Sequence, residues 1–135
     1  MNNKDLEKEV KRLVHQKRYK KGYVCAIDVL LELGYLTEKD YKDWRFGRIS
    51  YLEKVCQVNL SKLTLLNKLI AKYSKELELK KSWTAYNQHG IKGAKRRLRF
   101  SKSGIDSIEK RYATHHIDTK RIAELNTKSK NDPQI

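Results

Sequence analysis

The sequence predicts an α+β fold: a single, mainly helical domain of about five helices, followed by a basic β-hairpin and a C-terminal helix. A chain of 135 residues suits one domain with one modest core. The only proline, Pro133, lies close to the C-terminus, so no proline interrupts the helices before it. Apolar residues recur at helical spacing up to about residue 81 and then alternate with other residues over 82–101.

Glycines and capping residues divide the N-terminal half into short helices. The predicted segments are 4–20 ending at Gly22, 25–33 ending at Gly34, 37–47 ending at Gly47, and 51–57 after the cap Ser50. Thr37 is a favoured N-cap with Asp40 three residues later, an approximate capping box. These stops and caps predict tight turns between the helices.

The fifth helix has the clearest pattern. Asn59 can cap it, and its apolar stripe is Leu63, Leu66, Ile70, Tyr73 and Leu77, at spacings of 3, 4, 3 and 4 and widened by Leu60, Leu65 and Leu69. Two heptads are too few for a coiled coil, so the pattern favours the central core helix of the domain. A homodimer through this stripe stays open.

Beyond residue 81 the period changes to that of strands. Residues 82–88 and 95–101 form two β-like runs, and a glycine-bearing loop between them can close a hairpin at about 82–101. Ser103 caps the last helix, over 104–113. The domain therefore covers residues 1–117, and we expect residues 118–135 to form a polar, disordered tail.

Charge is abundant and arranged in blocks. The chain has 31 lysine and arginine residues against 16 acidic ones, a formal net charge of +15. Seven basic residues lie between Lys8 and Lys21 with one acid, and eight lie between Lys80 and Lys102 with none, whereas residues 28–57 are nearly neutral. An excess of basic residues that is concentrated in blocks favours binding to a polyanionic partner over a role in solubility alone. Nucleic acid is the first candidate, with duplex DNA slightly ahead of RNA.

The hairpin carries the predicted contacts. Because Leu98 and Phe100 should face the core, Arg97 and Arg99 should share the solvent face, where guanidinium groups can fork onto phosphate or guanine. The predicted phosphate contacts are Lys92, Lys95, Arg96, Arg97, Arg99 and Lys102, with a second patch of Lys17, Arg18, Lys20 and Lys21. Trp83 and Tyr86 lie on opposite faces of one strand, so one of them should be exposed beside the arginines.

Other readings of the same residues stay open. The segment 27–58 could form a helix-turn-helix whose helix after Ser50 enters a major groove. Gly90-Ile91-Lys92-Gly93 has the form of the KH-domain loop, but β-like segments flank it, so we prefer a turn. Lys102 and the helix N-terminus after Ser103 could hold one phosphate. The rival function is an adaptor that docks an acidic protein.

The sequence offers little for catalysis, so we do not expect an enzyme, and we predict no catalytic residue, metal site or cofactor. The paired acids Asp28 and Glu32 would suit a metal-dependent nuclease, which ranks behind binding and docking. His115 and His116 are adjacent, so their side chains should point in different directions and are poorly placed to share a metal ion. The two cysteines lie in apolar surroundings, so we expect free thiols. The N-terminus has no apolar run and the chain has no long apolar stretch, so we expect a cytoplasmic protein with no membrane partner.

Several short motifs resemble those of a group of small bacterial proteins for which we know of no assigned activity. They are Trp44-Arg45-Phe46-Gly47-Arg48, Tyr51-Leu52-Glu53-Lys54-Val55-Cys56, Ser82-Trp83-Thr84, Leu98-Arg99-Phe100-Ser101-Lys102-Ser103-Gly104 and Tyr112-Ala113-Thr114-His115. The resemblance covers roughly residues 20–116. It implies no function and no site residues.

Overall fold

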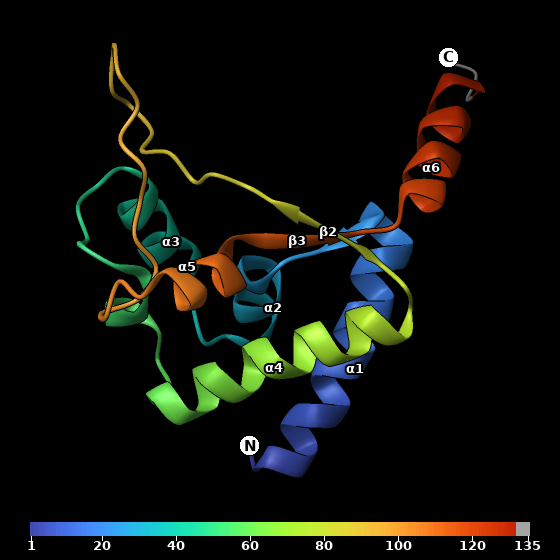
Figure 1. Cartoon of the computed structure of the whole chain (residues 1–135), viewed down its shortest axis with the longest axis horizontal. Helices are drawn as coiled ribbons and strands as arrows, with labels where there is room; N and C mark the ends of the chain where they lie inside the picture. Colours follow the sequence, from blue (N-terminus) through green and yellow to red (C-terminus); the bar gives the residue numbers. More distant parts are fainter. Residues whose placement is uncertain (132–135) are drawn as a thin grey trace.

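Helices surround a small antiparallel sheet in the computed structural model, which describes residues 1–131 (Figure 1). The elements in chain order are α1 (Asn3–Lys21), β1 (Tyr23–Val24), α2 (Ala26–Leu33), α3 (Glu38–Arg45), the 3₁₀ helix η1 (Leu52–Val55), α4 (Leu60–Glu76), β2 (Lys80–Trp83), α5 (Asp106–Ala113), β3 (Thr114–Ile117) and α6 (Thr119–Asn131). The predicted fold class, α+β and mainly helical in a single domain, is confirmed. Over residues 1–131, no helix has both the length and the apolar character needed to cross a bilayer.

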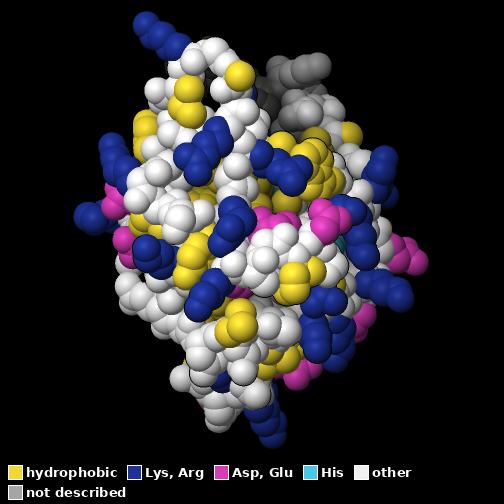
Figure 2. All heavy atoms as spheres, turned by 60° about the vertical axis from the view of Figure 1, so that its left-hand side comes forward, with side chains coloured by type: hydrophobic (Ala, Val, Ile, Leu, Met, Phe, Trp, Pro, Cys, Tyr) yellow, Lys and Arg dark blue, Asp and Glu magenta, His cyan; other side chains and the backbone are white. Residues whose placement is uncertain are grey.

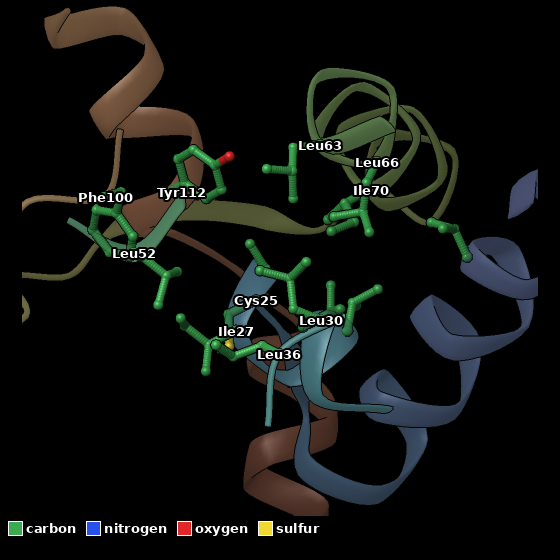
Figure 3. Packing of buried hydrophobic residues seen from close by; sticks show 14 of the residues in the cluster. Cys25, Ile27, Leu30, Leu36, Leu52, Leu63, Leu66, Ile70, Phe100 and Tyr112 are labelled. Carbon is green, nitrogen blue, oxygen red and sulfur yellow. The ribbon is translucent and has the colours of Figure 1, made fainter. Parts of the chain in front are cut away.

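Helices α1 and α4 lie against each other and enclose one side of the core (Figures 1 and 3). Helix α4 buries Leu63, Leu66 and Ile70, which Figure 3 shows pointing toward Leu30 and its neighbours on α2. The interpretation of this stripe as core is therefore confirmed, although Leu60 at its start is 63% exposed.

The predicted stops and caps of the N-terminal helices are largely confirmed. Gly22 and Gly34 end α1 and α2 in the left-handed conformation, and the side chain of Thr37 accepts a hydrogen bond from the amide of Asp40. The helix predicted over 51–57 is wrong, because only the four residues of η1 are helical. The amides of Leu52 and Glu53 donate instead to the carbonyls of Arg99 and Phe100, at 3.2 and 2.9 Å. A groove-reading helix therefore does not begin at Ser50.

The sheet has the order β1-β3-β2, with β3 in the centre. Lys80 pairs with Ile117 and Trp83 with Thr114, so β2 joins a strand from the C-terminal part of the chain. The prediction of a hairpin at 82–101 is therefore wrong, because its two segments do not pair as two strands. Residues 84–105 form a long loop instead, which we call the basic loop, and its two legs meet at a single antiparallel bridge between Asn87 and Arg97.

The predicted disordered tail is helical in its described part, which forms α6. Asp118 caps α6 by accepting from the amide of Arg121 at 2.9 Å, and it also binds Arg18 of α1 at 2.8 Å. Gly22 allows the close approach of Ile122, because a Cβ at position 22 would lie 2.4 Å from its side chain. Residues 132–135 of the predicted tail lie outside the described residues.

Candidate nucleic-acid interface

The basic loop extends from the body of the molecule beside α3 and carries the first set of predicted contacts (Figure 1). The structure places all six on this loop and exposes all six: Lys92, Lys95, Arg96, Arg97, Arg99 and Lys102. Among the residues that the structure describes, none of the six forms an ion pair with an acidic side chain. Their charge is therefore not neutralised within the described chain.

Two carboxylates hold the C-terminal leg of the loop through its backbone. Glu109 of α5 accepts from the amides of Phe100 and Ser101 at 2.9 and 2.7 Å, and from the hydroxyl of Ser101 at 2.5 Å. Glu53 of η1 accepts from the amide of Lys102 at 2.9 Å and from the hydroxyl of Tyr112 at 2.7 Å. Charged acceptors make stronger hydrogen bonds than neutral ones, so this leg has a defined position.

Aromatic packing fixes the same leg to the core. Phe100 stacks on Tyr112 with ring centroids 5.4 Å apart, and the indole nitrogen of the fully buried Trp44 donates to the carbonyl of Arg99 at 2.8 Å. Leu98 and Phe100 are both buried. The predicted inward direction of these two residues is confirmed, and it leaves the alternating Arg97 and Arg99 on the outer side.

The N-terminal leg of the loop is anchored at the end of α3. The amide of His89 donates to the carbonyl of Arg45 at 2.7 Å, and the side chain of Gln88 donates to the carbonyl of Phe46 at 3.2 Å. Gly47 has φ = 77°, and a Cβ there would lie 2.5 Å from the amide group of Gln88. The glycine therefore lets the loop reach α3.

Arg97 and Arg99 are both exposed, as predicted, but their guanidinium groups make different contacts. The guanidinium of Arg97 lies over the ring of Trp83, 5.6 Å from its centroid. Arg99 instead turns back to donate to the carbonyls of Ser101 and Lys102 at 2.8 and 2.9 Å. Arg97 is therefore the freer of the two for a ligand. Trp83 is the exposed aromatic residue predicted beside the arginines, and Tyr86 is buried.

The second predicted patch lies at the C-terminal end of α1, close to α6 and on the other side of the molecule from the basic loop (Figure 1). Three of its four residues are paired: Lys17 with Glu32 at 2.7 Å, Arg18 with Asp118 at 2.8 Å, and Lys21 with Asp28 at 2.5 Å. The hydrogen bond from Lys17 lowers the pKa of Glu32 below its usual value. Lys20 is exposed, and among the described residues it has no ion-pair partner.

Asp28 and Glu32, the paired acids that would suit a metal-dependent nuclease, are the partners of Lys21 and Lys17 in these ion pairs. Within residues 1–131, no three His, Cys, Asp or Glu side chains form a group that could hold a metal ion. His115 and His116 point to opposite faces of β3. His115 stacks on Tyr23, whereas His116 is buried, and this burial lowers its pKa to about 4.

Comparison with protein-family models, curated proteins and solved structures finds no match for this chain. The geometry of the basic loop is therefore what defines the candidate interface. Figure 2 shows lysine and arginine side chains across the face that carries the loop, with exposed hydrophobic side chains between them.

Sequence reasoning missed the residues that hold the loop in place. Glu53 and Glu109 position its backbone, and their signal in the sequence was weak, because Glu53 lies far from the loop along the chain and Glu109 looks like an ordinary acid on a short helix. Lys80 and Lys81 on β2 are also exposed, and they belong to the acid-free block 80–102 that the sequence did show.

Proposed function

We propose that this protein binds nucleic acid through its basic loop, with the six exposed cations of the loop contacting backbone phosphates. The observation that carries the proposal is the difference between the two predicted patches. Three of the four cations at the end of α1 have acidic partners, whereas the six on the loop have none among the described residues. Cations without an acidic partner on the protein are those that a polyanion can neutralise.

Duplex DNA is the first substrate to consider, ahead of RNA. The loop extends from the body (Figure 1), and the exposed Lys92, Lys95 and Arg96 lie on the short segment beyond its Asn87–Arg97 bridge. Arginine forks can bind phosphate oxygens or the O6 and N7 atoms of guanine in the major groove. Contacts to phosphate alone would give binding without sequence preference.

Binding to phosphates releases counterions, so the affinity falls with salt concentration in proportion to the number of phosphate contacts. On duplex DNA the slope of log K against log salt is about −0.9 per phosphate contact, so three engaged cations predict a slope of roughly −3. Replacing Lys95 and Arg96 with alanine should flatten the slope by about two units, equally on unrelated sequences.

The matched control removes the same amount of charge elsewhere. Lys39 and Lys72 are exposed but paired with Asp43 and Glu7. The double change Lys39→Ala and Lys72→Ala should therefore leave the slope nearly unchanged. Fluorescence anisotropy with labelled duplex DNA, single-stranded DNA and structured RNA over a range of salt concentrations measures these slopes. Equal effects of the two double variants, or no binding at low salt, would refute the proposal.

A second candidate, the adaptor for an acidic protein, is favoured by one feature. A groove of about 580 Å³ lies between α4 and α5, with Leu60 and Ile105 exposed in its lining and Lys102 and Arg111 beside them. An apolar groove with cationic neighbours suits an acidic segment that carries apolar anchors. If the loop cations do not affect nucleic-acid binding, this groove is the next surface to test by substitution.

A further inference from the structure

Trp83 has an unusual place for a large aromatic residue. It ends β2, which is an edge strand of the sheet, and 53% of its surface is exposed. The other tryptophan, Trp44, has no exposed surface. An exposed indole beside unpaired cations differs from an ordinary core aromatic, because it offers a flat apolar face next to groups that attract phosphate.

A pocket of about 170 Å³ adjoins the indole. Its lining includes Trp83 and Arg97, the largely buried Tyr86 and Phe100, which contribute apolar surface, and Asp106 and Lys110 of α5, which contribute charged groups. Asp106 and Lys110 pair with each other at 3.0 Å, and both are exposed. A lining that is apolar in one part and polar in another matches a nucleobase, which has apolar faces and a polar edge.

Arg97 already occupies a stacking position on this ring, because its guanidinium lies 5.6 Å from the centroid of the indole. The contact is solvent-exposed, and exposed cation–π contacts are weaker than the stacking of a base on an aromatic ring. A base can therefore replace the guanidinium. Arg97 would then be free to contact the phosphate of the same nucleotide.

We propose that Trp83 and the pocket beside it bind one unpaired nucleobase of a single-stranded nucleic acid, stacked on the indole, while the cations of the basic loop hold the adjoining backbone. This inference rests on the proposed function, since it needs the loop to bring the strand to the pocket. The recognition is sequence-tolerant, because every base has a π-face.

Tryptophan fluorescence tests the stacking directly. A base stacked on Trp83 should quench the emission of this tryptophan. The buried Trp44 should give a constant background, which is measured separately in the Trp83→Phe variant. Titration with a short mixed-sequence single-stranded DNA should quench the tryptophan fluorescence of the wild-type protein. An abasic oligonucleotide with the same number of phosphates should bind through the cations and quench much less.

Affinity gives the second measurement. Trp83→Ala should weaken binding of single-stranded DNA by about 5-fold or more, and Trp83→Phe by less, because phenylalanine keeps a stacking face. Binding of a blunt duplex should be unchanged in both variants, which also shows that they are folded. If Trp83→Ala binds single-stranded DNA as the wild type does, or if the abasic strand quenches equally, this inference is wrong while the proposed function stands. If no oligonucleotide binds at low salt, both are wrong.

Discussion

Changing Glu109 to glutamine tests how the basic loop is held. The carboxylate accepts from two backbone amides, those of Phe100 and Ser101, and from the hydroxyl of Ser101. The amide of glutamine can offer only one oxygen, so an NH₂ group must face at least one backbone N–H. An unsatisfied, partly buried donor costs about 1–3 kcal/mol, and the lost charge weakens the remaining bonds. We therefore expect Glu109→Gln to lower the free energy of unfolding by about 2–4 kcal/mol.

Urea denaturation followed by circular dichroism measures this loss, and an unchanged m-value would show that the unfolding transition stays comparable. Glu124→Gln is the matched control. Glu124 lies on α6 in an exposed ion pair with Arg121, and such pairs contribute about 0–1 kcal/mol. A loss for Glu109→Gln no larger than that of the control would refute the reasoning that this carboxylate holds the loop.

Two further predictions concern α6 and the sheet. Gly22 and Gly34 both have positive φ, so alanine should cost about 1 kcal/mol at Gly34, and at least about 1 kcal/mol more at Gly22, where its Cβ meets Ile122. Equal losses in thermal melts would show that α6 does not pack there. Burial lowers the pKa of His116 to about 4 and also lowers that of His115, so the unfolded state binds more protons than the folded state as the pH falls below 6.5. Stability should therefore fall by about 2 kcal/mol for His116 between pH 7 and pH 5. Urea titrations at both pH values check this, and an equally steep fall in His116→Gln would contradict it.

The helices could be predicted because their signals are local. The stripe Leu63, Leu66 and Ile70 follows one face of a helix, and glycine stops and N-caps act within one turn. The partner of β2 could not be predicted, because it is the four-residue run Thr-His-His-Ile of β3, which is short and shows no alternation of apolar and polar residues. Without that partner, residues 95–101 were the nearest strand-like run.

The same distinction separates the two predicted patches. Exposure of Arg97 and Arg99 followed from the alternation with Leu98 and Phe100, a local pattern that the structure retains. The pairing of Lys17 and Arg18 could not be read from the sequence, because their acidic partners lie 15 and 100 residues away. Long-range pairing of this kind depends on how the helices are placed, which spacing along the chain does not specify.

The central position of β3 has a consequence for how the protein is made. A ribosome synthesises β1 and β2 well before Thr114, yet within residues 1–131 the strand partner of each is β3. In a nascent chain that lacks β3, both strands have open edges, and open edges favour pairing with other chains. The helical pair α1 and α4 can form early, whereas the sheet closes only when nearly all of residues 1–117 have emerged. A transcript truncated before Thr114 should therefore yield a chain that aggregates or is degraded rather than a smaller working domain.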